Sequence, residues 1–450
     1  MRINKLKLEN YRLFKDVELD FSKESPGDTN VIVFIGNNGA GKTTILEALS
    51  LNLSWLVARI KRERASGSAM KDLAIANGEN FSVVTTDAVY SQTPYQWTLA
   101  KTMKGKKKTV ESNLKGLTEL AELFRDNYTK DENASLPLLA YYPVERTILD
   151  IPLKIRTKHS FGQLDGLDGS LQTGVDFRRF FEWFREREDS ESEVLARDVL
   201  PTMITKIQHD YDSIPPDNLD VLFNNVKTSL KDKQLNAVRN AIEALMPGFE
   251  NLRIERKPRL RMMVDKDNSQ LDVEQLSQGE KSLMALVGSI ASRLSMMNPA
   301  LAEPLEGRGI IMIDEVDLHL HPRWQQGIID RLRSVFPNCQ FILTTHSPLV
   351  ISNSQNILAY MLEDGDIRQL GNLYGMDANQ VLLQEMGVGI RNQDVQDKLD
   401  DVLDLIHDRE FPEAHAEIKE LEKELPTDHW ELNKIKILLM RKEAQFAKNN

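Results

Sequence analysis

The segment that most constrains the fold is the glycine-rich stretch "GNNGAGKT" at residues 36–43. Gly36, four further residues, and then Gly41, Lys42 and Thr43 have the spacing of a phosphate-binding loop (P-loop). The loop follows the apolar run "VIVFI" and precedes "TILEALS", so we expect a strand, the loop and a helix in that order. Glycines let backbone N–H groups turn inward around phosphate oxygens, and the helix N-terminus adds a favourable dipole.

The P-loop predicts how ATP and Mg²⁺ are bound. We expect Lys42 to reach the β- and γ-phosphates and the Thr43 hydroxyl to hold Mg²⁺. The other expected phosphate contacts are Asn37, Asn38, Gly39, Ala40, Gly41 and Thr44.

Two further apolar strands end in polar residues. "IIMIDE" at 310–315 ends in Asp314 and Glu315, and an unpaired buried carboxylate is costly, so the acids indicate function. We expect Asp314 to hold Mg²⁺ and Glu315 to orient or deprotonate the attacking water. His346 follows "FILTT" and is interpreted as a γ-phosphate sensor, because parallel sheets place ligand contacts at the carboxyl ends of strands. The alternatives are a capping Asp with a solvated Glu, and a merely hydrogen-bonded His.

The segment "LSQGEKS" at 276–282, here called the signature segment, opens a second helix. Ser277, Gly279 and the helix N-terminus together make an end suited to an anion. An ordinary helix cap, with Ser277 as N-cap and Glu280 three residues on, is the alternative, and the two roles can coexist.

These four elements together resemble the head of ABC-type ATPases. The opening "LENYRLFKDVELDF" and the stretch "DEVDLHLHP" narrow the resemblance to the soluble RecF/SMC/OLD-like branch. The resemblance implies an α/β fold with a mixed sheet around the P-loop core and an antiparallel β lobe. It also implies that two heads pack head to tail, so that Ser277 and Gly279 touch the ATP of a second protomer.

The same resemblance assigns two more residues. Asp317 would lie at the interface between the heads, and Arg12 of "ENYRLF" would lie near the nucleotide, unless it is a surface charge at a strand end. The family's glutamine loop has no clear counterpart, with Gln92 and Gln96 as the candidates.

A closer resemblance is to the PtuA family, the ATPase subunits of Septu anti-phage systems, and to related retron-associated ATPases. It rests on the spacing from "LPLLAYYPVER" to the signature segment, on "DEVDLHLHPRWQ", and on the tail "LYGMDANQVLLQEMGVGIRNQDV". It implies a PtuB-like, HNH-type nuclease subunit as partner, with this chain as its scaffold or nucleotide-sensing regulator. The chain itself shows no Cys/His nuclease cluster and no acidic nuclease constellation after the ATPase core.

The distribution of motifs, apolar periodicity and charge along the sequence predicts four regions. Residues 1–149 and 251–390 are the two halves of the ATPase head, 150–250 a helical insertion, and 391–450 an acidic extension of three amphipathic helices. We further expect one helix from about 323 to 335, and a strand carrying the alternating arginines of "RIERKPRLR" at 253–261. The insertion shows no sustained heptads, which argues against a long coiled coil.

Charge is distributed unevenly. Residues 394–431 hold 14 Asp/Glu and 4 Lys/Arg, a net of −10 out of −11 for the chain. This acidity favours docking of a basic partner on 391–450, or else a helical hairpin packed on its own ATPase core. Lysines gather at Lys101–Lys108, where a nucleic acid could bind directly, although a solvated turn explains them as well. A RecF-like DNA-repair ATPase that binds DNA without a nuclease is therefore the alternative function.

Other classes of protein fit less well. No run of about 18 apolar residues occurs, so no membrane span is expected. The single cysteine, Cys339, excludes an internal disulfide and fits a reducing, cytoplasmic location. A transporter's nucleotide-binding subunit would need a clear glutamine loop.

Overall fold

The computed structural model describes residues 1–22, 30–144, 161–172, 177–194, 197, 232–387, 389 and 391–449. The chain forms two compact units, Met1–Met376 and Asp377–Asn450, which are considered separately below. The end of the "YYPVER" segment and much of the expected helical insertion lie outside the described residues. The unit boundary precedes the expected boundary at 390/391, so residues 377–390 group with the extension.

A six-stranded sheet forms the centre of the first unit, with strand order β13-β12-β3-β11-β10-β6. The neighbours from β12 to β6 are parallel, and β13 is antiparallel to β12. Its strands are β3 (Val31–Gly36), β6 (Leu138–Tyr142), β10 (Gly309–Ile313), β11 (Cys339–Thr345), β12 (Leu358–Glu363) and β13 (Asp366–Gln369). β3, β6, β10 and β11 are buried at every residue, which explains their continuous apolar runs.

An antiparallel sheet of order β2-β1-β4-β5 forms the expected β lobe. Its strands are β1 (Arg2–Tyr11), β2 (Phe14–Asp20), β4 (Phe81–Tyr90) and β5 (Thr93–Thr102). Gln340 of β11 joins the two sheets, because its side-chain amide exchanges hydrogen bonds of 2.7 and 2.9 Å with the backbone of Ile3. The expected α/β head, with a mixed sheet and an antiparallel lobe, is therefore confirmed.

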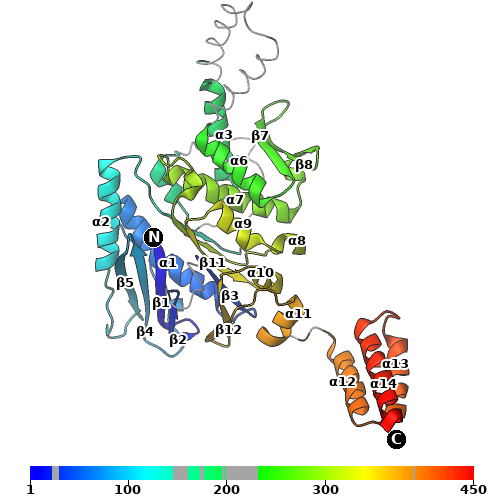
Figure 1. Cartoon of the computed structure of the whole chain (residues 1–450). Coiled ribbons are helices and arrows are strands. Elements are labelled where there is room, and N and C mark those ends of the chain that lie inside the picture. The colour runs from blue at the N-terminus through cyan, green and yellow to red at the C-terminus, as the bar shows by residue number, and fades with distance from the viewer. Residues whose placement is uncertain are drawn as a thin grey trace, which may run out of the picture. The chain divides into compact units, whose positions relative to one another are not determined.

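Helices cover these sheets (Figure 1). They are α1 (Lys42–Lys61), α2 (Lys115–Lys130), α3 (Phe177–Val194), α6 (Lys233–Leu245), α7 (Gln278–Met297) and α10 (Pro348–Ser352), with short 3₁₀ turns at Asp72–Ala74, Gln163–Leu167, Val273–Gln275 and Pro304–Glu306. α7 is buried at every residue from Ser282 to Met297, and α3 and α6 pack against it. A Cβ at Gly288 of α7 would lie 2.6 Å from the Phe180 ring, so glycine permits the close approach of α3.

A third sheet, β7-β8-β9, lies beside α6 and leads into the signature segment (Figure 1). Its strands are β7 (Phe249–Glu255), β8 (Arg261–Lys266) and β9 (Ser269–Asp272). The expectation of one strand for "RIERKPRLR" is wrong, since Glu255 pairs with Arg261 across an antiparallel hairpin. Its arginines contact acids of the same chain, for example Arg253 with Asp265 at 2.8 Å.

The helix expected from about 323 to 335 is also interrupted. It forms two helices, α8 (Pro322–Gln325) and α9 (Ile328–Val335). Gly327 has φ +75°, a left-handed conformation that glycine adopts without strain, and it caps α9. The side chain of His321 caps α8 by accepting a hydrogen bond of 3.2 Å from the backbone N–H of Arg323.

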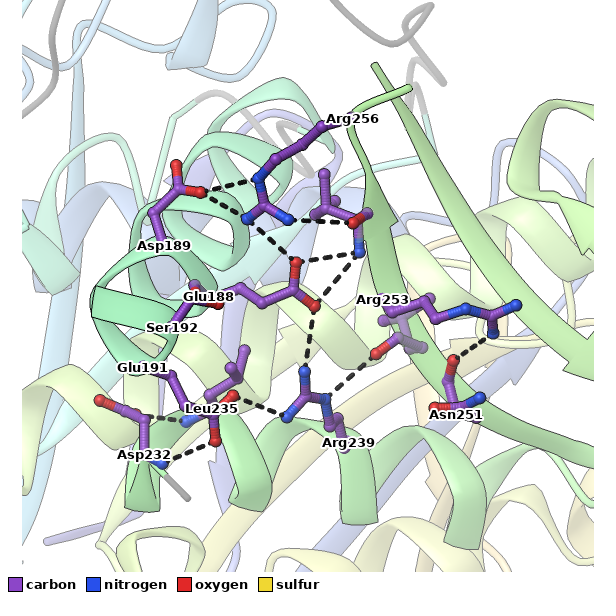
Figure 2. Close-up of polar contacts among 12 residues, drawn as sticks. Glu188, Asp189, Glu191, Ser192, Asp232, Leu235, Arg239, Asn251, Arg253 and Arg256 are labelled. Carbon is purple, nitrogen blue, oxygen red and sulfur yellow. Dashed lines mark hydrogen bonds and ion pairs between the residues drawn. The ribbon is translucent and has the colours of Figure 1, made fainter. Parts of the chain in front are cut away.

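A buried carboxylate joins α3, α6 and β7 (Figure 2). Glu188 of α3 accepts hydrogen bonds from Arg239 of α6 at 3.1 Å and from the backbone N–H of Ile254 in β7 at 3.1 Å. Arg256 contacts both Glu188, at 3.4 Å, and Asp189. Burial raises the pKa of Glu188, although the two arginines and the Ile254 N–H oppose that shift. We call Glu188, Arg239 and Arg256 the α3 clasp.

The second unit contains the three helices expected from the sequence. They are α12 (Gln393–His407), α13 (Phe411–Glu424) and α14 (Trp430–Asn449), preceded by the short turns α11 (Ala378–Gln380) and Val381–Glu385. Their apolar stripes face one another in a common core that includes Leu399, Val402, Ile418, Leu421 and Ile435. The stripes thus stabilise the unit itself.

Candidate nucleotide-binding and hydrolysis site

The expected site residues of the P-loop, Asp314, Glu315 and His346 lie at the carboxyl ends of three adjacent strands. β3 ends in the P-loop, β11 ends before His346, and β10 ends before Asp314 and Glu315. Because β11 lies between β3 and β10 in parallel register, with Ile35 opposite Thr345 and Ile313 opposite Leu343, the three ends meet at one edge of the sheet. This is where open α/β sheets bind ligands.

The P-loop glycines are required by its geometry. A Cβ at Gly36, which has φ +150°, would lie 2.3 Å from the Leu362 carbonyl oxygen. Gly41 has φ +103°, caps α1, and lies so close to Phe14 that a Cβ would be 2.7 Å from that ring. The loop therefore passes tightly over β12 and the β lobe into the N-terminus of a long helix, as anion binding requires.

Lys42 lies inside the loop. Its ammonium donates hydrogen bonds to the carbonyl oxygens of Gly36 at 2.8 Å and Asn37 at 3.0 Å. Burial lowers the pKa of Lys42, while the nearby carboxylates of Glu315, Asp314 and Asp317 act in the opposite direction. The Lys42 ammonium is thus held at the loop backbone, beside the N-terminus of α1, where a phosphate would meet a cation and the positive end of a helix dipole.

Asp314 is the most buried acid of the site, 1% exposed. Its two carboxylate oxygens accept hydrogen bonds from Thr43 at 2.7 Å and from Thr344 at 2.5 Å. A carboxylate beside a threonine hydroxyl offers the oxygen ligands that Mg²⁺ prefers. In the described part of the chain, no three His, Cys, Asp or Glu side chains gather as a metal site, so Mg²⁺ would need phosphate oxygens and water as further ligands.

Glu315 and His346 face each other. The His346 Nε2 lies 3.7 Å from the Glu315 Oε1. Glu315 has φ +46°, and its backbone N–H donates to the Thr344 hydroxyl at 2.7 Å, which fixes the turn that carries its carboxylate. Burial and the Lys42 cation lower the pKa of His346, against the acids Glu315, Asp317 and Asp314, so the imidazole is neutral at pH 7.

The segment from Asp317 to His319 connects this site to the signature segment. It accepts a hydrogen bond from the Thr345 hydroxyl, next to His346 in sequence. Two residues further on, His319 has φ +61°, and its carbonyl oxygen would lie 2.1 Å from a Cβ at Gly279. Gly279 is therefore the point where the signature helix α7 contacts the loop that follows Asp314 and Glu315.

Ser277 forms a capping box with Glu280, which the sequence offered as the alternative to a phosphate contact and as compatible with one. The Ser277 N–H and hydroxyl donate to the Glu280 carboxylate at 2.9 and 2.8 Å, and the Glu280 N–H donates back at 3.4 Å. Lys266 of β8 donates to the other Glu280 oxygen at 2.6 Å. Burial acts to raise the pKa of Glu280, but the bonds from Lys266 and Ser277 outweigh it, and the net shift is downward. Ser277 remains exposed at the start of α7.

Arg12 lies beside the first turn of α1. It sits in the turn between β1 and β2 with φ +52°, donates to the Thr44 hydroxyl at 3.4 Å, and pairs with Glu47. Gln92 lies in the β4–β5 turn, at the end of the β lobe opposite Arg12, because Val89 pairs with Arg2. The side chain of Gln96 donates to Asp87 at 2.8 Å on β4.

Three supporting residues were missed from the sequence. Thr344 holds Asp314 and the Glu315 backbone, Thr345 holds Asp317, and Lys266 holds Glu280. Two threonines at the end of the apolar run "CQFIL" were a usable signal for the first two, because buried hydroxyls need partners. Lys266 gave no local signal, since the contact depends on how β8 packs beside α7.

Comparison with known proteins fits this geometry. The family model described as "AAA domain, putative AbiEii toxin, Type IV TA system" matches residues 31–352, from the start of β3 to the end of α10. The chain belongs to this family. It is an ABC-type ATPase that binds and hydrolyses nucleotide.

Three relatives show which ATPases it resembles. It is 34% identical over 401 residues to "Retron Ec83 probable ATPase" of Escherichia coli, covering 81% of this chain and 72% of the relative. It is 32% identical over 408 residues to "Retron Vc95 probable ATPase" of Vibrio cholerae, covering 84% and 78%. With "Septu protein PtuA" of Bacillus mycoides it shares 23% identity over 356 residues, covering 77% of this chain and 38% of PtuA. The resemblance to retron and Septu ATPases is confirmed.

None of the described helices is long and apolar enough to cross a bilayer.

Proposed function

We propose that this ATPase dimerises head to tail around ATP and Mg²⁺ and regulates or scaffolds an HNH-type nuclease subunit in anti-phage defence. The observation that carries the nucleotide part is the meeting of Lys42, Thr43, Asp314, Glu315 and His346 at one sheet edge. The retron and PtuA relatives support the defence role and the presence of a partner.

The residue roles follow from the contacts. Lys42 exchanges the loop carbonyls for the β- and γ-phosphate oxygens, and Thr43 and Asp314 hold Mg²⁺. Bound Mg²⁺ supplies charge neutralisation at the phosphates. Glu315 accepts a hydrogen bond or the proton from the attacking water, and neutral His346 donates a hydrogen bond toward the γ-phosphate. Arg12 and the backbone of residues 37–41 complete the phosphate contacts.

The second protomer supplies Ser277 and Gly279. Ser277 is exposed, and the N-terminus of the 20-residue helix α7 carries a partial positive charge. The P-loop of each chain already has its own helix N-terminus at α1, so the α7 end is free to contact another chain's γ-phosphate. Asp317 would lie at the same interface.

Mixing two inactive variants tests the head-to-tail arrangement. Lys42→Ala destroys the P-loop, and Ser277→Arg blocks the signature segment. In a mixed dimer, the intact P-loop of one chain meets the intact signature of the other. We expect the mixture to recover about a quarter of the wild-type rate, because half of random dimers are mixed and each has one working site of two. Absence of recovery, with both variants folded, would show that the signature does not act across chains.

Purification of the tagged chain from its native locus tests the partner. We expect an HNH-type nuclease subunit at fixed stoichiometry by native mass spectrometry. A matched purification with ATP and with ADP would show whether the nucleotide state changes the assembly. A chain that purifies only with copies of itself contradicts the partner part of the proposal and leaves the ATPase part intact.

The Lys101–Lys108 segment favours one alternative, a RecF-like ATPase that binds DNA directly. Lys104, Lys106 and Lys107 are exposed, whereas Lys101 pairs with Asp72 at 3.2 Å and Lys108 with Glu111 at 2.9 Å. This alternative expects ATP-dependent DNA binding that weakens steeply with salt and is lost in Lys106→Glu/Lys107→Glu. DNA binding only in the presence of a nuclease subunit would favour the first proposal.

A further inference from the structure

Helix α14 differs in charge from the rest of the second unit. Residues 377–450 contain 17 Asp/Glu and 10 Lys/Arg, a net of −7, but α14 (430–449) contains 2 Asp/Glu and 5 Lys/Arg, a net of +3. The helices α12 and α13 are therefore acidic and pack against one basic helix. A charge reversal confined to one helix indicates that its surface has a different use from its neighbours.

The same helix exposes large apolar side chains. Trp430 is 66% exposed, Ile437 53% and Met440 64%, at spacings of seven and three residues that place them toward one side of a helix. With Phe446 they are four of the eight most exposed large apolar side chains among the described residues. A concentrated exposed apolar stripe marks an interaction surface more than scattered single residues do.

A groove runs between α12 and α14. It has a volume of about 420 Å³ and lies entirely within the second unit. Its apolar lining consists of Leu399 and Leu403 from α12 and Ile435, Ile437 and Leu438 from α14. The polar members of its lining are Arg391, Gln396, Glu431, Lys434 and Arg441.

The rim of the groove is positively charged. Glu431 is paired with Arg391, so these two charges cancel. Lys434 lies over the Trp430 ring, with its ammonium 3.8 Å from the ring centroid, and keeps its charge there. Arg441 is exposed on the same helix. The groove thus combines an apolar floor with two cations, next to helices α12 and α13, which carry a net negative charge.

We infer that this groove binds an amphipathic helix of the partner protein, with apolar residues on one face and Asp or Glu beside them. Short amphipathic helices bind apolar grooves through anchors at spacings of three, four and seven residues. Acidic flanks complement Lys434 and Arg441. The acidity of residues 391–450 favoured a basic partner, but Lys434 and Arg441 would repel basic side chains at this groove.

A second copy of this unit does not fit the groove. The apolar faces of α12 and α13 are already buried in the core of their own unit, through residues such as Val402 and Ile418. Their exposed faces are polar and acidic and offer no anchors. The α14 helix of a second copy does expose apolar side chains, but its net charge of +3 would be repelled by Lys434 and Arg441. The inference rests on the proposed function, because it names the docking chemistry of the proposed partner.

Site-specific photo-crosslinking of the natively purified complex tests the inference. Benzoylphenylalanine replaces Ile437 in the groove or, as a control, the exposed Glu413 of α13. We expect a cross-link only from position 437, to a peptide of a different protein with helically spaced apolar residues and a net negative charge. A cross-link to a basic peptide or to a second copy of this chain, or equal labelling from position 413, would overturn the inference.

Charge reversal gives an independent readout. Lys434→Glu/Arg441→Glu should weaken partner retention by about tenfold or more, with unchanged ATPase activity of the isolated chain. Lys442→Glu on the same helix, outside the groove lining, is the matched control and should retain the partner. Full retention by the double variant would refute the docking site while leaving the proposed function intact. A wild-type chain with no partner at all would refute both the docking site and the partner part of the proposed function.

Discussion

Glu315 is the residue whose replacement separates nucleotide binding from hydrolysis. Its backbone is fixed by Thr344, and its carboxylate lies 3.7 Å from His346, so glutamine can occupy the same place without accepting a proton. We expect Glu315→Gln to bind ATP normally and to hydrolyse it roughly 10²- to 10⁴-fold more slowly. Steady-state ATPase rates and native mass in ATP measure this, and the second should show accumulation of the closed dimer.

Glu363→Gln is the control for this substitution, because Glu363 is an exposed glutamate at the end of β12. It should leave the rate unchanged. Turnover at the wild-type rate in Glu315→Gln would instead remove Glu315 from the chemistry and direct attention to His346.

His346 leads to a prediction about pH. Burial and Lys42 lower the pKa of His346 below its ordinary 6.5, so its imidazole stays neutral as the pH falls to that value. In the unfolded chain this histidine takes up a proton at higher pH than in the folded chain, so the stability linked to it falls as the pH falls through the unfolded pKa. We expect NMR titration of the nucleotide-free protein to give a pKa below 6.5 for His346. A value above 6.5 would mean that Glu315 and Asp317 dominate its surroundings.

We expect Lys266 to position Ser277 of the signature segment without contacting the ATP that is bound at the P-loop of the same chain. Its 2.6 Å bond orients Glu280, which in turn holds the Ser277 hydroxyl. Loss of a charge-assisted hydrogen bond in Lys266→Met should lower kcat by about tenfold and leave the Kd for ATP at the P-loop unchanged. Lys266→Arg should restore most of the rate, and Lys233→Met, at an exposed position of α6, is the control. An equal loss in Kd would indicate general unfolding.

At the scale of elements, the α3 clasp stabilises the junction of α3, α6 and β7. Removing the Glu188 carboxylate takes away the acceptor of the buried Ile254 N–H, which costs about 1–3 kcal/mol, while Arg239 keeps Glu191 and Arg256 keeps Asp189. We expect Glu188→Ala to lower Tm by several degrees and to speed hydrogen exchange in α3 and β7. Glu186→Ala, an exposed neighbour on the same helix, should have little effect. Equal Tm values for the two variants would show that the clasp adds no net stability.

The elements that sequence reasoning identified correctly are those with strong local patterns. Continuous apolar runs predicted β3, β10 and β11, and the capping residues Ser277 and Glu280 predicted the start of α7. The errors arose where a short local feature interrupts a longer pattern. Gly327 interrupts the expected helix, and the turn before Arg261 converts the expected single strand into a hairpin. Contacts between distant segments, such as Lys266 with Glu280, depend on packing and gave no periodic signal.

At the scale of the whole molecule, we expect ATP hydrolysis and partner docking to reside in different units. Every residue assigned to ATP lies in Met1–Met376, whereas the proposed docking groove lies in Asp377–Asn450, which has its own apolar core. Two units with separate cores can fold and act independently. Residues 377–450 carry −7 of the net charge of −11 of the chain, so the net charge of the whole chain says little about the ATPase unit.

Truncation after Met376 tests this separation. Because the first unit keeps its sheets, P-loop and signature segment, residues 1–376 should fold cooperatively and retain ATP hydrolysis within about threefold of the full chain. Partner retention should be lost, since Leu399, Ile437 and Arg441 are absent. Circular dichroism, ATPase rates and co-purification measure the three properties on the same preparation. A folded but inactive truncation would show that the second unit contributes to hydrolysis, because the truncation removes no residue that was assigned to ATP.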